Sequence, residues 1–249
     1  VSTVPSVVFD PNRFRPARML QREHLVYGWG AGSLLSTDYR PTDQGQYAVE
    51  AGLAWDWDTR VSWTFPTEGR SLWMSVDAGW VPASDSVWGA WRSGGVGLVS
   101  HHPRLVFAGR FGAALAYGSV EHRLLDLGGL NALVSVPAGT FVGNARAFVS
   151  MESRLVVLDR ASIALPFVWL EQIQISGGLE GGFLGYGQER SAWQKDFQWG
   201  LGATAGITVV VDVLGVREGM VGLTLGVPIL FDPPVDPLPT ALVRWTQAY

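Results

Sequence analysis

Cysteine is absent from this chain of 249 residues. Its absence excludes a disulfide scaffold and a metal site built on thiolates. Charged residues make up only 16% of the chain and sum to a net charge of −4, without a basic stripe or a run of arginines. We therefore expect no nucleic-acid partner, because phosphate binding needs such a basic surface.

Long apolar helices are also missing, although hydrophobic residues make up 47% of the sequence. The longest uncharged windows run from Leu127 to Ala145 and from Phe197 to Val211. The first window contains Pro137 and several glycines, which a spanning helix tolerates poorly, and the second is too short and alternates. If this chain crosses a membrane, we expect strands to do so.

Residues that suit catalysis or metal binding are few. The four histidines are His24, His101, His102 and His122. The segment His101-His102-Pro103 has the composition of a turn, and Ser100 beside it does not by itself specify a nucleophile with its base. We therefore expect no enzymatic centre, no cofactor and no bound metal.

Glycine and aromatic residues are abundant instead, with 31 glycines, 12 tryptophans and 6 tyrosines. This composition suits tightly curved sheets that carry aromatic belts at two membrane interfaces. A soluble β-sandwich is the alternative that composition leaves open.

Apolar residues recur at every second position in several long segments. The clearest runs from Phe197 to Val211, where apolar residues occupy the odd positions and glycine, threonine or glutamine occupy most even ones. The same pattern repeats over residues 46–58, 72–80, 110–118, 144–157, 173–183 and 221–229. A strand with lipid on one face and a polar or crowded interior on the other has this period of two.

These segments and the turns between them predict an all-β fold, an antiparallel transmembrane β-barrel of roughly eight to twelve strands. We place the barrel at residues 24–230, after a lead-in over residues 1–23 that is either irregular or a disordered terminus. Residues 231–249 form a proline-rich tail. Because Val243, Trp245 and Tyr249 alternate with Arg244 and Thr246, we expect the tail to be ordered, as an extra strand or docked on a partner.

Charged side chains occupy the face opposite each apolar row. Since an unpaired charge in hydrocarbon is costly, we expect them to point into the barrel and to share a charge network. Its expected members are Asp56, Asp58, Asp77, Arg110, Arg146, Glu152, Arg154 and Glu180. We interpret the close acidic pair of Asp56 and Asp58 as charge partners of Arg60 or Arg110 rather than as metal ligands.

The segment Asp58-Thr-Arg-Val-Ser-Trp-Thr-Phe-Pro-Thr-Glu-Gly69 resembles a signature of the Omp85 superfamily, the outer-membrane assembly and translocation barrels. In that family an Asp-x-Arg strand end precedes a Pro-Thr-x-Gly turn. Further segments resemble the family in the same order: residues 128–144 its long extracellular loop, 151–154 the next strand, 178–182 its acidic motif and 222–229 its closing strand. The matching motif residues are Asp58, Arg60, Pro66, Gly69, Gly143, Glu152, Arg154, Glu180 and Gly182. The resemblance implies a divergent, shortened form of the family's C-terminal barrel.

One departure from the family bears on function. Where the family carries an Arg-Gly pair at the tip of its lumen-folded loop, this chain has Val134 and Ser135. The arginine that would pair with the acid at Glu180 is therefore absent, and a family-type latch lacks its ionic anchor. A dry Glu180 would then require another cation or protonation.

Two functions of different classes follow. The first is a reduced Omp85-like barrel that moves or inserts polypeptide or lipid, and the second is a non-catalytic barrel that anchors or completes an envelope assembly. The missing arginine favours the second, whereas the ordered motifs indicate ancestry with the first, which does not decide activity. A small passive pore is less expected, because few strands leave an interior filled by side chains.

The expected location is the bacterial cell outer membrane. The expected partners are outer-membrane lipid, either lipopolysaccharide or phospholipid, and other envelope protein subunits.

Overall fold

The fold is described from a computed structural model of the chain. The structure describes residues 23–35, 46–60, 67–82, 85–118, 125–129, 132–159, 163–165, 168–185, 197–213, 217–232 and 238–247. Residues 1–22 of the expected lead-in and the motif residue Pro66 lie outside the described residues.

Strands make up nearly all the regular structure. They are β1 (Glu23–Leu35), β2 (Gln46–Asp58), β3 (Gly69–Val81), β4 (Ser86–His102), β5 (Leu105–Gly118), β6 (Leu125–Asp126), β7 (Val142–Gly143), β8 (Ala145–Leu158), β9 (Ile163–Leu165), β10 (Val168–Gly185), β11 (Phe197–Val213), β12 (Arg217–Asp232) and β13 (Thr240–Gln247). None of the described residues forms a helix long and apolar enough to cross a membrane.

One antiparallel sheet of eleven strands contains almost all of these elements. Its path runs β1-β2-β3-β4-β5-β8-β10-β11-β12-β13, with β9 paired to β10 off the path, and β6 and β7 form a separate small sheet. The expectation of an antiparallel all-β fold is confirmed. Within the described residues, β1 and β13 end the path and no hydrogen-bonded pairing closes the sheet between them.

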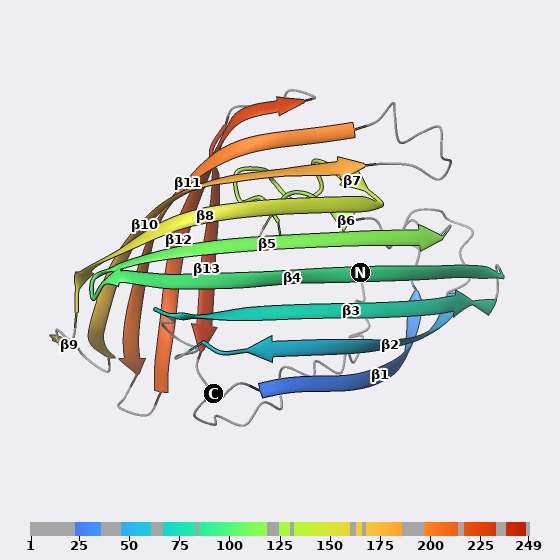
Figure 1. The fold of residues 1–249 in the computed structure, drawn as a ribbon, viewed down its shortest axis with the longest axis horizontal. Helices are drawn as coiled ribbons and strands as arrows, with labels where there is room; N and C mark the ends of the chain where they lie inside the picture. Colours follow the sequence, from blue (N-terminus) through green and yellow to red (C-terminus); the bar gives the residue numbers. More distant parts are fainter. Residues whose placement is uncertain are drawn as a thin grey trace.

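The large sheet is strongly curved. In Figure 1, β1 to β5 run across the view, and β10 to β13 curve around the left side and pass behind them. This curvature gives the sheet a convex face and a concave face. β10 alone is 18 residues long. Small residues on the concave side of such a long strand allow it to curve.

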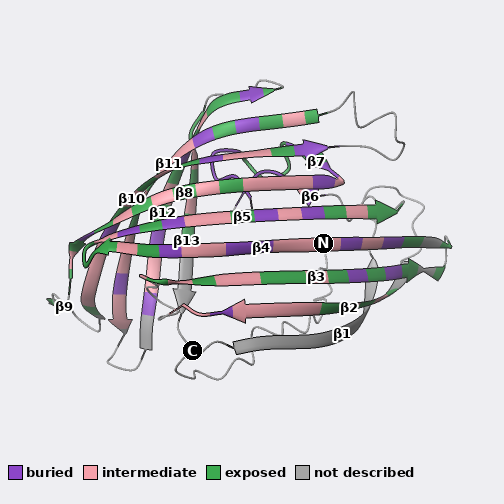
Figure 2. Cartoon of the chain, viewed as in Figure 1, coloured by how far each residue is buried: buried purple, intermediate pink, exposed green. Residues whose placement is uncertain are grey.

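Exposure alternates along the strands, as Figure 2 shows for β3, β5 and β10. On β11 the convex face carries Trp199, Leu201 and Ile207, which are 37%, 39% and 43% exposed. The concave face carries the buried polar residues, including Asp77 and Glu180, which are 2% and 3% exposed. The residues with apolar character in the sequence pattern therefore line the outside of the curve.

A loop between β5 and β8 folds back over the concave face. Its arms contain the short strands β6 and β7, and its residues between them are largely buried (Figure 2). The main core cluster joins this loop to the sheet and consists of Ala114, Leu125, Leu127, Leu133, Val136, Phe141, Leu184 and Phe231. We call residues 125–144 the infolded loop.

The expected tail contributes the last strand of the sheet. β13 pairs antiparallel with β12, from Gly226 opposite Thr240 to Gly219 opposite Gln247. An extra strand was one of the two forms expected for this segment. Residues 233–237 lie outside the described part of the chain.

Candidate functional site

The infolded loop is held in shape by its own backbone. The Asp126 carboxylate accepts hydrogen bonds from the amides of Gly128 and Gly139, at 2.7 and 2.5 Å, and so joins the two arms. Gly129 and Gly139 have φ values of +82° and +79°, which side-chain-bearing residues rarely adopt. The Asp126 carboxylate and these two glycines therefore fix the local shape of the loop.

The tip of the loop meets Glu180 on β10. The backbone amide of Ser135 donates a hydrogen bond of 2.6 Å to Glu180 Oε1. Ser135 is fully buried and Glu180 nearly so. A hydrogen bond to a carboxylate is stronger than one between neutral groups. An amide of the loop tip thus occupies the position at which the Omp85 resemblance implied an arginine.

Two glycines of the concave face make room for the tip. A Cβ atom at Gly226 of β12 would lie 2.5 Å from the Ser135 nitrogen, and one at Gly202 of β11 would lie 2.0 Å from Ser135 Oγ. Both distances are shorter than any real Cβ contact, so only glycine allows the tip to touch the wall here. The glycines that the sequence pattern placed on the concave row therefore form a seat for the loop.

The last strand also contacts the tip. The hydroxyl of Thr240, the first residue of β13, donates to the carbonyl oxygen of Val134 and lies 3.3 Å from the carbonyl oxygen of Gly226. This contact joins residues that are 106 positions apart in the chain.

Two arginines hold the loop from the opposite side. Arg110 of β5 donates to the carbonyl oxygen of Ala132 at 2.7 Å, and Arg146 of β8 donates to that of Asp126. Both guanidinium groups lie against the ring of Phe148, 5.1 and 5.6 Å from its centroid. Together with Glu180 and Thr240, they make the infolded loop a brace across the concave interior.

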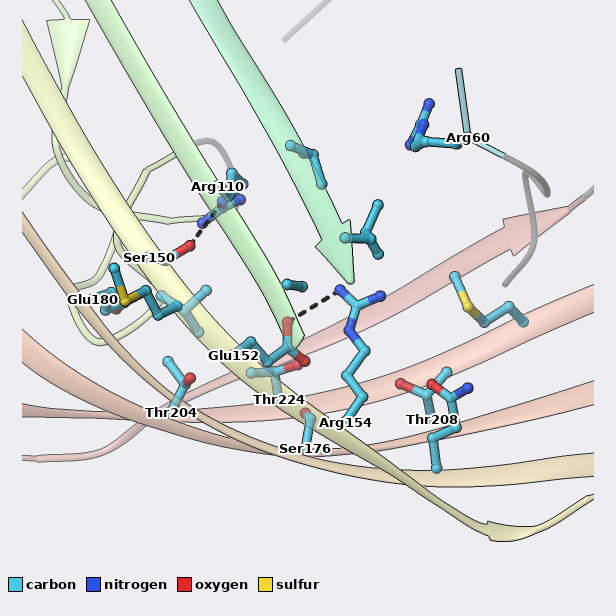
Figure 3. Close-up of a pocket in the computed structure, with 17 residues that line it drawn as sticks. Arg60, Arg110, Ser150, Glu152, Arg154, Ser176, Glu180, Thr204, Thr208 and Thr224 are labelled. Atoms are coloured by element: carbon cyan, nitrogen blue, oxygen red, sulfur yellow. Dashed lines mark hydrogen bonds and ion pairs between the residues drawn. The ribbon is translucent and has the colours of Figure 1, made fainter. Parts of the chain in front are cut away.

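A polar cavity of about 290 Å³ lies beside the loop tip. Figure 3 shows Glu152 and Arg154 of β8 paired at its centre, with an N–O distance of 3.1 Å. Hydroxyl groups from three further strands line it, namely those of Ser176, Thr204, Thr208 and Thr224. The lining mixes both signs of charge with neutral hydroxyls, which suits water more than a single ion.

The other expected charges lie on the same concave face. Asp58 forms an ion pair with Arg60, whose side chain donates to it at 2.6 Å, and Asp77 pairs with Arg92 of β4. Asp56 is half-buried on β2 between Trp55 and Trp57 in sequence. The structure thus places Asp58, Asp77, Glu152 and Arg154 in ion pairs with close neighbours, whereas Arg110, Arg146 and Glu180 hydrogen-bond to the backbone of the infolded loop.

Sequence reasoning missed Arg92, Asp126, Ser135 and Thr240 as contact residues. Arg92 could have been found, because it occupies an even position of β4 on the same row as other inward charges. Ser135 and Thr240 could not, because their contacts depend on where the loop folds back.

The glycines of the expected motif have local structural roles. Gly69 has a φ of +109°, and a Cβ there would lie 2.6 Å from the Cα of Arg60. A Cβ at Gly143 would lie 2.5 Å from the carbonyl oxygen of Gly185, and one at Gly182 would lie 2.9 Å from the side chain of Leu127. These glycines allow a hairpin to close and the loop to pack.

The histidine-containing turn contains hydrogen bonds of its own. Ser100 donates to the carbonyl oxygen of His102, and His102 Nδ1 accepts from the amide of Arg104 at 3.2 Å. Across the described ranges, no group of three histidine, aspartate or glutamate side chains is arranged to hold a metal ion.

No protein-family model, curated protein or solved structure matches the chain. The Omp85 resemblance therefore stays a prediction, and function is inferred from the geometry.

Proposed function

We propose that the chain is a transmembrane β-barrel of a bacterial outer membrane, and that it serves as a non-catalytic anchoring or structural subunit of an envelope assembly. Lipid explains the convex face best, because large apolar side chains stand there in exposed rows, among them Leu53, Met151, Leu179 and Val243 at 65%, 70%, 57% and 72% exposure. A water-exposed face of this kind would be an aggregation hazard.

Closure of the sheet follows from the same proposal. A sheet in lipid must pair the backbone groups of both its edges, which only a closed barrel does. The path from β1 to β13 contains ten strands that alternate in direction, so β1 and β13 run antiparallel. An even number of antiparallel strands is what bacterial single-chain barrels have. These features support closure between β1 and β13.

The brace formed by the infolded loop is the observation that supports a structural role. Guanidinium groups of β5 and β8 hold one side of the loop, and Glu180 of β10 with Thr240 of β13 holds the other. An interior crossed by such a brace suits a rigid anchor better than a conduit.

In this proposal the convex face contacts lipopolysaccharide or phospholipid, and the rims contact other envelope subunits. The test is purification of the native complex in mild detergent, followed by mass measurement and by conductance of the reconstituted protein. A complex of fixed subunit stoichiometry without ion conductance is the expected result. A monomer that conducts ions would instead support a passive pore, and accelerated folding of added barrel proteins would support insertion of polypeptides.

A further inference from the structure

Within the described residues, β12 pairs with β13 over only part of its length. β12 extends from Arg217 to Asp232, but β13 covers it only from Gly219 to Gly226. Past Gly226, β12 is supported on its concave side by the loop, since Phe231 stacks on Phe141 of the loop with ring centroids 6.0 Å apart. β12 pairs with β11 from Arg217 to Asp232, and among the described residues its further contacts change near Gly226, from β13 to the loop.

Thr240 stands at that point. Its hydroxyl donates to the carbonyl oxygen of Val134 in the loop tip, and it lies opposite Gly226 in the β12–β13 register. The tip is pressed against the same glycine through Ser135. One side chain of the terminal strand thus contacts both the loop and the neighbouring strand.

We infer that Thr240 is a positioning residue, a latch that couples the seating of the infolded loop to the pairing of β13 with β12. Val134 is only 7% exposed, and its carbonyl would lose this hydrogen-bond partner if the hydroxyl were removed. Because coupling between two equilibria is reciprocal, release of the loop tip must also weaken the pairing of β13. This inference depends on the contacts of the loop and not on the anchoring role.

Loop seating can be read from the reactivity of a single cysteine, because the natural chain has none. Val136→Cys places a smaller side chain at a loop position that is 1% exposed. We would measure its rate of labelling by a charged maleimide in detergent, in otherwise natural protein and with Thr240→Val, Thr240→Ser or Thr208→Val. Thr208 is the matched control, because its hydroxyl lines the cavity on β11.

The expected result is an increase of about three- to tenfold in labelling rate for Thr240→Val, the range that corresponds to loss of one hydrogen bond. Thr240→Ser and Thr208→Val should label at the natural rate. Equal labelling rates with Thr240→Val and with the natural Thr240 would overturn the inference. Fast labelling of the Val136→Cys variant that keeps Thr240 would also overturn it.

The effect of loop seating on the pairing of β13 with β12 gives a second measurement. It tests the inference even if Thr240→Val does not fold. Thr224 and Leu242 face each other across β12 and β13, so a cysteine pair there reports strand pairing by disulfide formation. Glu180→Ala removes the contact of the loop tip with β10, and it should slow disulfide formation by a similar factor. An unchanged rate would show that the loop and β13 are independent.

Discussion

The contact between Glu180 and Ser135 holds the loop tip to β10 through a carboxyl oxygen and a backbone amide. Glu180 is 3% exposed and accepts the Ser135 amide at 2.6 Å. Glu180→Ala removes the acceptor and leaves a buried amide unsatisfied, whereas Glu180→Gln keeps an oxygen in place. We expect Glu180→Ala to lower the free energy of unfolding by about 1.5–3 kcal/mol, and Glu180→Gln to cost clearly less.

Urea denaturation in detergent, followed by tryptophan fluorescence, measures both free energies. Equal losses for the alanine and glutamine variants would show that the acceptor oxygen is not what holds the tip.

Two glycines of β12 give a second matched comparison at the residue scale. A Cβ at Gly226 would lie 2.5 Å from the Ser135 nitrogen, whereas one at Gly222 would lie 3.4 Å from the nearest atom, Thr208 Oγ1. We expect Gly226→Ala to destabilise the protein by about 1–3 kcal/mol, the usual cost of overpacking, and Gly222→Ala to be nearly neutral. Urea denaturation measures both free energies of unfolding. A larger loss for Gly222→Ala than for Gly226→Ala would contradict the contact assigned between Gly226 and the loop tip.

At the scale of single residues, the sequence predicted on which face of the sheet a side chain lies, but not which residue it contacts. The period of two indicated that Asp58, Asp77 and Glu180 share a side with the arginines, because neighbouring strand positions point in opposite directions. It could not indicate that Asp77 pairs with Arg92 or that Glu180 accepts an amide. Those contacts depend on strand register and on the path of a loop, which alternation does not encode.

Among the elements, the infolded loop and β13 are joined by the hydrogen bond from Thr240 to Val134. The loop has few regular hydrogen bonds to the sheet, and its burial comes from packing on Leu184 and Phe231. β13 begins at Thr240, after a segment with several prolines, which cannot donate to a ladder. The sequence nevertheless indicated that this tail would be ordered, from its alternating apolar residues.

Deletion of residues 233–249 tests the role of the last strand. It removes the partner of β12 from Gly219 to Gly226 and the donor to Val134. We expect the truncated chain to fail in assembly, because a newly exposed edge strand and an unlatched loop would favour aggregation. The fraction of folded protein after extraction from membranes measures this. If the truncated chain folds in normal yield and only loses its partners, β13 is a docking element instead.

For the whole molecule, the sequence could predict the strands and which side chains lie on each face of the sheet. Strand positions such as Phe197 to Val211 and their faces followed from the period of two, and the curvature was consistent with abundant glycine. The infolded loop could be expected only through the Omp85 resemblance, because its residues have no periodic pattern. Closure between β1 and β13 is not determined by either and stays part of the proposal.

The proposed barrel predicts a specific environment for every position of β11. Cysteines placed singly from Ala203 to Thr208 can carry a spin label in protein reconstituted into liposomes, where collision with oxygen reports lipid and collision with a polar nickel complex reports water. Labels on the convex positions 203, 205 and 207 should favour oxygen, and labels on the concave positions 204, 206 and 208 should not. This alternation is the predicted result, whereas equal accessibility of both faces to the nickel complex would contradict a membrane-spanning sheet.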